Sequence, residues 1–363
     1  MHLFEHGGQS PWLDNLRRGW ITSGQLDAWV EGGIRGLTSN PAIFQKAIEG
    51  SADYDEQFGD LIAGGSQVAE AYWNLVTSDI QGALKALRPV FDGSDGSDGY
   101  VSVEVDPSLA HDGPGTTAAA RALHEGIAQP NLMVKIPGTT AGLDAIRTMI
   151  SEGRSINVTL IFSVPRYREV IEAYLSGLEE LASAGTTDLS HVSSVASFFI
   201  SRTDTEVDRR LEDIGSPAAL DLCGRTAVAQ AQVAYQAFQE AFSGPRWERL
   251  AALGARLQRP LWASTSTKNP AYPDTLYVDE LIGPDTVNTM PDATIDAFLE
   301  RGTVARTIDA DPSAAQGVLD AVQGVGVALD EVAHQLEQEG VSAFVKSFDE
   351  LLASLDTKAS SLR

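Results

Sequence analysis

A chain of 363 residues, 43% of them hydrophobic, is long enough for one large domain or two ordinary ones with an ample core. Its formal net charge of −24 would repel a phosphate backbone, which argues against nucleic acid as a partner. A single cysteine, Cys223, excludes an internal disulfide framework and fits a reducing compartment. With no signal-peptide core and no apolar run of about 20 residues, the sequence predicts a cytoplasmic protein without a membrane span.

The negative charge also bears on small anionic ligands. A surface with 50 acidic and 26 basic residues disfavours the approach of phosphorylated metabolites. If the substrate carries phosphate, a few Arg or Lys side chains must be gathered locally to receive it.

Predicted strands and helices alternate along the chain. Short or alternating apolar runs predict strands at about residues 12–14, 34–37, 100–106, 131–136, 155–162, 192–200, 259–266 and 286–290. Helical patterns lie at about residues 25–31, 66–90, 114–128, 141–151, 165–182, 204–212 and 217–242, and in a tail at 313–355 with a weak point near 324–326. This alternation is typical of an α/β protein with a parallel sheet.

The stretch at residues 92–99, Asp-Gly-Ser-Asp-Gly-Ser-Asp-Gly, separates the helix at 66–90 from the strand at 100–106. Its acids do not have the spacing of an EF-hand loop, which places ligands at every second residue and ends in Glu. We therefore expect a mobile surface loop.

Each predicted strand has one apolar face and one polar face. In the strand at 100–106, for example, valines alternate with Ser102, Glu104 and Asp106. An open doubly wound sheet packs helices on both faces, so both faces should be apolar. A closed barrel instead gives the polar side chains a shared lumen, and eight such strands predict an α/β fold of the (β/α)₈ type. We expect the catalytic barrel at residues 1–300 and a helical extension, residues 301–363, packed on it.

The segment from Asn131 to Thr140 places a lysine in a buried strand. Apolar side chains alternate with Met133 and Lys135, so Lys135 points to the polar face near the carboxyl end of the strand. A desolvated lysine loses proton affinity and becomes an amine nucleophile, which is the basis of Schiff-base catalysis. The simpler alternative is a lysine whose stem lines the sheet while its ammonium group reaches water.

Other polar residues lie near the carboxyl ends of the predicted strands, where the catalytic groups of a barrel meet. They are Asp14, Asn40, Glu104, Asn157, Thr159, Ser197, Arg202 and Lys268. Each has a simpler explanation alone: Asp14 could cap a helix, Asn40 could be a turn residue, Asn157 and Thr159 could be a hydrogen-bonded core pair, and the two cations could be solvated. Their joint occurrence at strand ends favours an active site.

Six short motifs resemble those of the transaldolase family, whose members are Schiff-base enzymes of the pentose phosphate pathway. The motifs are Trp-Leu-Asp14, Gly36-Leu-Thr-Ser-Asn40-Pro41, Val103-Glu104-Val-Asp106, Val134-Lys135-Ile-Pro-Gly-Thr-Thr140, Ile156-Asn157-Val-Thr159-Leu-Ile-Phe-Ser163 and Ala263-Ser-Thr-Ser-Thr-Lys268-Asn-Pro270. The spacing from Ser197 to Arg202 also fits, and the match runs from about residue 10 to residue 291.

By this resemblance, four residues carry the chemistry. Lys135 forms the Schiff base, and Glu104 and Thr159 hold the water that moves protons during imine formation. Asp14 is the acid/base for the sugar hydroxyl whose deprotonation breaks the carbon–carbon bond.

The resemblance also implies a substrate-binding set. It consists of Asn40 and Asn157 for hydroxyl groups, Ser197, Phe199 as a wall, Arg202 for the terminal phosphate, Ser266 and Lys268. The chain departs from many relatives in having Lys268 where they have Arg. Lysine binds phosphate as a point charge without the bidentate fork of arginine.

The expected reaction is reversible transfer of a dihydroxyacetone unit between phosphorylated ketoses and aldoses, with no metal and no organic cofactor. The nearest alternative is a fructose 6-phosphate aldolase of the same superfamily. A barrel that only binds sugar phosphates is a third possibility. The sequence leaves open whether the protein is a monomer or a homodimer.

Overall fold

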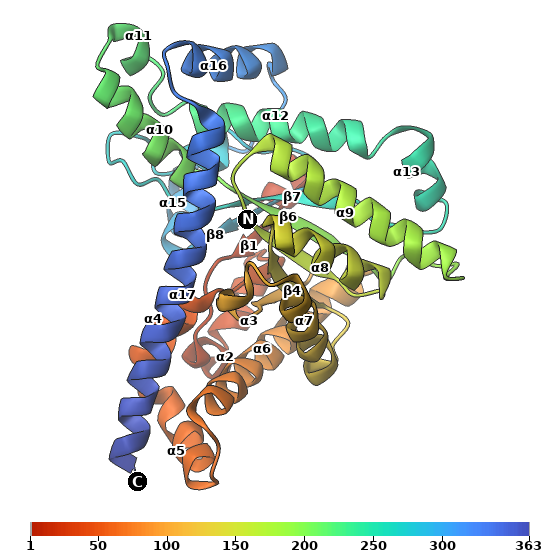
Figure 1. The fold of residues 1–363 in the computed structure, drawn as a ribbon, viewed down its shortest axis with the longest axis vertical. Helices are drawn as coiled ribbons and strands as arrows, with labels where there is room; N and C mark the ends of the chain where they lie inside the picture. The colour runs from red at the N-terminus through yellow and green to blue at the C-terminus, as the bar shows by residue number, and fades with distance from the viewer. Residues whose placement is uncertain (1, 363) are drawn as a thin grey trace.

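The computed structural model describes residues 2–362, and its eight strands close into a parallel barrel (Figure 1). The strands are β1 (Gln9–Leu13), β2 (Gly36–Thr38), β3 (Val101–Glu104), β4 (Leu132–Pro137), β5 (Ile156–Ile161), β6 (Ser194–Phe199), β7 (Gln258–Ala263) and β8 (Thr286–Met290). Each strand pairs with the next along the chain, and β8 closes the barrel against β1. The predicted (β/α)₈ architecture is therefore confirmed.

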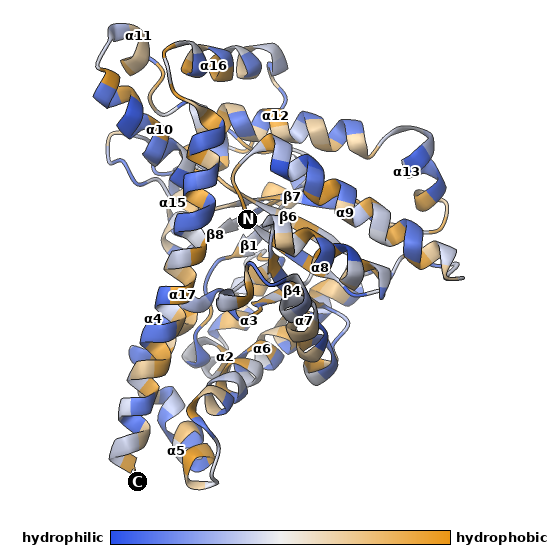
Figure 2. Cartoon of the chain, in the orientation of Figure 1, coloured by the Kyte–Doolittle hydropathy of each residue, from blue (hydrophilic) through white to orange (hydrophobic). Residues whose placement is uncertain are grey.

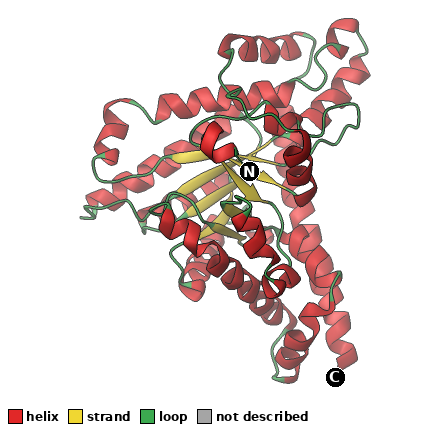
Figure 3. Ribbon diagram, turned by 180° about the vertical axis from the view of Figure 1, so that it is seen from behind, coloured by secondary structure: helices red, strands yellow, loops and turns green. Residues whose placement is uncertain are grey.

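Helices surround the strands on the outside of the barrel, as the view from behind shows (Figure 3). The α-helices are α1 (Leu3–Gly7), α2 (Arg18–Ser23), α3 (Gln25–Glu31), α4 (Pro41–Glu49), α5 (Asp55–Ala63), α6 (Val68–Gly93), α7 (Gly113–Ile127), α8 (Thr140–Ser151), α9 (Val164–Ser183), α10 (Ser201–Ile214), α11 (Pro217–Leu220), α12 (Thr226–Ala241), α13 (Gly244–Ala251), α14 (Leu276–Asp279), α15 (Asp292–Arg301), α16 (Pro312–Gly324) and α17 (Leu329–Leu362). Two short 3₁₀ helices are η1 (Ala52–Tyr54) and η2 (Pro107–Leu109). No helix within residues 2–362 is both long and apolar enough to cross a bilayer.

The helices present apolar faces to the barrel and polar faces outward. Figure 2 shows alternating hydrophobic and hydrophilic bands along helices such as α9 and α12. The outward faces of the strands supply the other half of this core, where Val103, Val134 and Val158 are at most 1% exposed. Burial of these side chains fixes which residues of each strand face the lumen.

The strand register brings polar residues side by side in the lumen. Glu104 of β3 is paired with Lys135 of β4, and Lys135 is paired in turn with Asn157 of β5. Opposed residues of neighbouring strands point to the same face of the sheet. The alternation predicted for β3 and β4 is therefore confirmed.

Two strands depart from strict alternation near their carboxyl ends. Leu160 adopts a left-handed φ of 59° beside a register shift between β5 and β6, so Leu160 leaves the outer face and packs with residues of the barrel mouth. Ser264 has a φ of 58° directly after β7, so the strand ends before Ser266. Strict alternation of apolar and polar faces therefore fails at Leu160 because of a bulge. The prediction that the strand beginning at residue 259 continues to residue 266 is wrong, because β7 ends at Ala263.

The predicted helix at 217–242 is two helices, α11 and α12. Gly224 lies between them with a φ of 73°, and a Cβ there would lie 2.7 Å from the ring of Tyr272. This left-handed, closely packed turn requires glycine and breaks the helix. The sequence also did not predict α15, which follows β8 and completes the βα alternation.

The C-terminal tail is two helices, α16 and α17, as the glycines near residue 325 predict. The 34-residue α17 contacts α4, α10 and η2, which all follow strands and so lie at the carboxyl-end face of the barrel (Figure 1). It therefore crosses the barrel mouth. The division of the chain at residue 300 stays a prediction.

The aspartate-rich segment at residues 92–99 is not simply a surface loop. Asp98 is only 1% exposed, and the backbone of Gly99 hydrogen-bonds to Arg35 directly before β2. The prediction of a mobile loop is therefore wrong for its last residues, because long-range partners hold them.

Asp98 closes the amino end of the barrel with charge-assisted hydrogen bonds. Arg35 Nε lies 2.8 Å from one carboxylate oxygen, and Arg259 Nη2 lies 3.3 Å from the other. Trp12 Nε1 donates to the same carboxylate at 2.9 Å, and Ser10 donates to it as well. One buried acid thus ties β1 to the segments that begin β2 and β7.

We predict that Asp98→Asn lowers the free energy of unfolding by about 3 kcal/mol, because it leaves two partly buried arginines without their carboxylate. Urea denaturation followed by circular dichroism measures this change. The control is Asp92→Asn, whose ion pair with Arg88 is largely exposed and should cost under about 1 kcal/mol. Equal effects of the two variants would contradict a structural role for Asp98.

Candidate active site

Lys135 is held inside the upper part of the barrel lumen. Its Nζ lies 3.4 Å from Glu104 Oε2 and donates a 3.1 Å hydrogen bond to the carbonyl oxygen of Ser39. Lys135 is 4% exposed and Glu104 is 5% exposed. The alternative in which the ammonium group reaches bulk water does not apply, because the buried carboxylate is its neighbour.

Glu104, beside this amine, and Thr159, which borders the same cavity as Lys135, have buried oxygens without hydrogen-bond partners among the described residues. Among the described residues, neither carboxylate oxygen of Glu104 nor the hydroxyl of Thr159 has a hydrogen-bond partner. Burial raises the pKa of Glu104, and the charge of Lys135 partly opposes that rise. Unpartnered buried acceptors are costly for stability, so their retention points to a function.

Asp14 follows β1 and faces the same space. Its Oδ1 accepts a 2.7 Å hydrogen bond from Thr38 Oγ1, so it is not simply a helix cap. Burial raises the pKa of this carboxyl group, while Lys135 and Arg202 oppose the rise. The charge of Lys135 thus opposes the rise in pKa of two acids, Asp14 and Glu104.

Asn157 and Ser197 form a hydrogen-bonded pair beneath the cavity. Ser197 Oγ donates to Asn157 Oδ1 at 2.7 Å, and Asn157 Nδ2 donates to Ser102 Oγ at 3.0 Å. Ser197 borders the inner cavity described below, but Asn157 is fully buried and is not among its lining residues. Asn157 is therefore a buried hydrogen-bonded residue, but its partners are Ser197 and Ser102 and not Thr159, so the core pair of Asn157 with Thr159 considered from the sequence does not form.

Asn40 both caps a helix and borders the inner cavity. Its Oδ1 accepts a 3.0 Å hydrogen bond from the backbone N–H of Ile43 and caps α4, with Pro41 at the first helical position. Asn40 also lines the cavity at the mouth. The cap fixes the orientation of its amide group.

Arg202 lies at the mouth between two aromatic rings. Its guanidinium carbon is 5.3 Å from the ring centroid of Phe199 and 5.9 Å from that of Phe344. Phe344 belongs to α17, which approaches closely because Gly340 has no side chain: a Cβ there would lie 2.9 Å from Leu160. Sequence reasoning predicted a helix here but missed Phe344, since no local pattern shows which helix covers the barrel.

Two adjoining cavities open at the carboxyl-end face. The inner cavity, of about 170 Å³, is bordered by nine of the predicted site residues: Asp14, Asn40, Lys135, Thr159, Ser197, Phe199, Arg202, Ser266 and Lys268. The outer cavity, of about 830 Å³, shares Asp14, Asn40, Arg202 and Lys268 with it. The structure thus brings the predicted residues together, with Glu104 and Asn157 behind the lining.

The loop after β7 contributes Ser266 and Lys268. Lys268 Nζ lies 2.5 Å from Ser266 Oγ, and both residues border the inner cavity. Burial lowers the pKa of Lys268, and the nearby charges of Arg202 and Lys46 lower it further. The cations are therefore close enough to repel one another, an arrangement that a bound anion would relieve.

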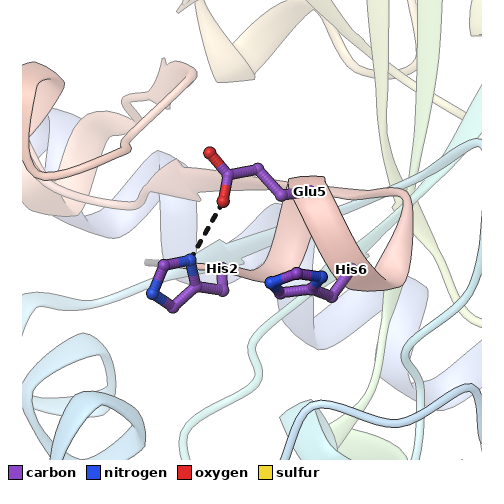
Figure 4. Close-up of side chains that lie close together, drawn as sticks. All are labelled: His2, Glu5 and His6. Carbon is purple, nitrogen blue, oxygen red and sulfur yellow. Dashed lines mark hydrogen bonds and ion pairs between the residues drawn. The ribbon is translucent and has the colours of Figure 1, made fainter.

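A separate cluster of possible metal ligands lies on α1 and the residue before it. His2, Glu5 and His6 bring ligand atoms within 4.8 Å of one another, and His2 Nδ1 is 3.0 Å from Glu5 Oε2 (Figure 4). All three are exposed. Because α1 precedes β1, the cluster lies at the amino end of the barrel, away from Lys135, and the expectation of a metal-free reaction stays a prediction.

Comparison with known proteins agrees with this geometry. The family model described as Transaldolase/Fructose-6-phosphate aldolase matches residues 11–355. The chain belongs to this family. The match includes all eleven predicted site residues and most of α17.

Relatives distinguish between the two activities in the family name. The chain is 51% identical over 347 residues to "Transaldolase" of Thermobifida fusca, covering 95% of this chain and 94% of the relative. It is 50% identical to "Transaldolase 1" of Streptomyces coelicolor, covering 97% and 93%, and 50% identical to "Transaldolase" of Mycobacterium leprae, covering 95% and 92%. These names favour transaldolase over fructose 6-phosphate aldolase.

The raised pKa of Asp14 predicts a pH-dependent effect on stability. An acid whose pKa is higher in the folded state binds a proton on folding, so its burial costs stability above the folded pKa and costs nothing below about pH 4. We predict that Asp14→Asn melts at a higher temperature than the unaltered protein at about pH 8. The difference should disappear as the pH falls to about 4.

Calorimetry across this pH range tests the prediction, with Asp92→Asn as the control for loss of an exposed acid. A lower melting temperature for Asp14→Asn at about pH 8, or a difference independent of pH, would show that Asp14 is not a desolvated carboxylate.

Proposed function

We propose that the protein transfers a dihydroxyacetone unit reversibly through a Schiff base on Lys135. The donors are sedoheptulose 7-phosphate and fructose 6-phosphate, and the acceptors are glyceraldehyde 3-phosphate and erythrose 4-phosphate. The observation that carries this proposal is the buried Lys135 amine, 3.4 Å from Glu104 and at the wall of a cavity that also contains Asp14.

Covalent attachment begins when neutral Lys135 Nζ attacks the ketose carbonyl carbon, C2. The carbinolamine loses its hydroxyl group as water and leaves an iminium ion. Starting from the neutral amine, nitrogen loses one proton and the departing oxygen gains two. One of these two protons comes from the amine and the other from an acid, which is the protonated carboxyl group of Glu104, whose pKa burial raises. In this proposal Glu104 and Thr159 hold the water molecule that carries these protons, which is supported by their oxygens having no partner among the described residues.

Bond cleavage follows when Asp14 removes the proton of the C4 hydroxyl group. The C4–O bond becomes a carbonyl, the C3–C4 bond breaks, and its electron pair moves to the iminium nitrogen to give an enamine. An acid with a raised pKa suits this step, because it accepts the proton and later returns it near neutral pH. Addition of the enamine to an incoming aldose reverses the sequence.

The cations at the barrel mouth bind the substrate phosphate. Arg202 is held between Phe199 and Phe344, and Lys268 lies across the same cavity. Guanidinium groups bind phosphate through paired N–H donors, while lysine contributes charge. Ser197, Ser266 and Asn40 supply polar contacts to the sugar, and Asn157 acts through its hydrogen bond to Ser197.

Retention of the three-carbon fragment separates a transferase from an aldolase. Helix α17 covers the mouth, with Phe344 at the cavity wall, and limits the access of water to the enamine. The enamine then waits for an aldose acceptor rather than being protonated and hydrolysed.

We extend the proposal to the protein as a whole. Residues 1–300 form the catalytic barrel and residues 301–363 the covering extension, in a cytoplasmic protein that is a monomer or a homodimer. The reaction uses sugar phosphates without a metal, an organic cofactor, nucleic acid or a membrane.

Replacement of the lysine tests the proposal directly. We predict that Lys135→Ala reduces transfer from fructose 6-phosphate to erythrose 4-phosphate to background, because it removes the amine beside Glu104 that forms the iminium ion. Coupled detection of glyceraldehyde 3-phosphate measures the rate, and circular dichroism checks the fold. The control, Lys85→Ala, changes an exposed lysine of α6 and should keep full activity; transfer retained by Lys135→Ala would refute the assignment.

Release of free dihydroxyacetone distinguishes transferase from aldolase. With fructose 6-phosphate alone, we predict at most one dihydroxyacetone fragment retained per active site and little in solution. Adding erythrose 4-phosphate should yield sedoheptulose 7-phosphate in many turnovers. Multiple-turnover release of dihydroxyacetone without an acceptor would favour the aldolase alternative.

A further inference from the structure

The outer cavity contains a cation that the reaction above does not use. Lys46, in the last turn of α4, borders the outer cavity together with Arg202 and Lys268, but it does not line the inner one. Its side chain is exposed, whereas Arg202 is partly buried. The cations therefore continue outward from the reacting amine along one opening.

Among the described residues, these three cations belong to the minority of lysines and arginines that lack an ion-pair partner, and they share one cavity. Most described lysines and arginines lie within 4.0 Å of a carboxylate, as Arg18, Arg121 and Arg246 do. Among residues 2–362, Lys46, Arg202 and Lys268 have no such partner, although acids outnumber bases almost two to one. Unpaired cations that face one cavity point to an anion that binds there.

The acids of the outer wall do not neutralise this group. Asp292 accepts a 3.3 Å hydrogen bond from Asn15 and lies 3.8 Å from Arg17. Asp53 also borders the cavity but forms no ion pair with Lys46 or Lys268 within 4.0 Å. The charge of Lys46 instead acts on Lys268, whose pKa it lowers.

Differences in substrate length explain why cations border both the inner and the outer cavity. This step rests on the proposed function, in which the iminium ion fixes ketose C2 at Lys135. The phosphate of sedoheptulose 7-phosphate then extends one carbon farther than that of fructose 6-phosphate. Among the aldoses, erythrose 4-phosphate likewise extends one carbon farther than glyceraldehyde 3-phosphate from the reacting carbon.

We infer that Lys46 is a further phosphate-binding residue, which selects for the longer members of the two substrate pairs. Arg202 and Lys268 serve both lengths because they border both cavities. Lys46 serves only the phosphate that reaches the outer cavity. Lys46 thus distinguishes the longer from the shorter substrate of each pair by the position of the phosphate, although both react at the same atoms.

The test compares Michaelis constants of Lys46→Gln for each substrate separately. We predict that KM for sedoheptulose 7-phosphate and erythrose 4-phosphate rises about threefold to tenfold, as expected for loss of one exposed charge contact with phosphate. KM for fructose 6-phosphate and glyceraldehyde 3-phosphate should change by less than about twofold. Turnover should stay unchanged, and the selective effect should shrink at high salt.

Three controls sharpen this comparison. Lys46→Arg keeps the charge and should restore the low KM for the longer substrates. Lys85→Gln removes another exposed lysine, which has no ion-pair partner within residues 2–362 and lies outside both cavities, and should leave all four constants unchanged. Unphosphorylated erythrose as acceptor should not distinguish Lys46→Gln from the unaltered protein, because it has no phosphate.

Equal KM changes for all four substrates, or no change for any, would overturn the role of Lys46. Those outcomes still require that transfer occurs. If the unaltered protein transfers nothing, the proposed function itself fails, so the two failures are distinguishable.

Discussion

A single cation–carboxylate pair inside the barrel constrains the rest of the structure. Lys135 and Glu104 are both almost completely buried, and their charged atoms are 3.4 Å apart. Removing two charges from water costs several kcal/mol for each ion, and attraction between them returns only part of that cost. A fold that keeps this pair must be stabilised elsewhere.

Strand register is what keeps the pair together. Glu104 opposes Lys135 across β3 and β4, and a slip of one residue would turn the lysine to the outer, apolar face. The valines on that face and the Asp98 network at the amino end resist such a slip. A charge-assisted network thus holds the amino end of the barrel, while at the carboxyl end Glu104 and Thr159 keep buried oxygens without partners among the described residues.

Function also depends on parts of the chain that are distant in sequence. Helix α17 brings Phe344 beside Arg202, which itself follows β6. The chemistry is therefore supplied by the strands, whereas the shape of the mouth depends on the C-terminal helix. Gly340 permits this approach because its missing side chain leaves room for Leu160.

Much of this arrangement follows from local sequence. Alternation of valines with Ser102 and Glu104 predicted the faces of β3, and eight such segments predicted the barrel. Local patterns could not reveal the left-handed Leu160, the burial of Asp98 or the position of Phe344. Each of these depends on residues far away in the chain, so no window of sequence contains the determining contact.

Most of the predicted site residues border one cavity, but the sequence did not show which residues line it and which lie behind the lining. Residues at strand ends met at one cavity because parallel strands share one carboxyl-end face. Whether a residue lines the cavity or supports the lining depends on packing depth, as Asn157 behind Ser197 illustrates. The alternation of apolar and polar residues along a strand does not show how deeply each side chain is packed.

The central claim is that the amine of Lys135 becomes covalently attached to a ketose. Borohydride reduction in the presence of fructose 6-phosphate, followed by mass spectrometry of the peptide containing Lys135, tests it most directly. The account predicts a stable mass increase of one reduced dihydroxyacetone or ketose unit on Lys135 and on no other lysine. An unmodified Lys135 peptide under these conditions, or an adduct on a different lysine, would contradict it.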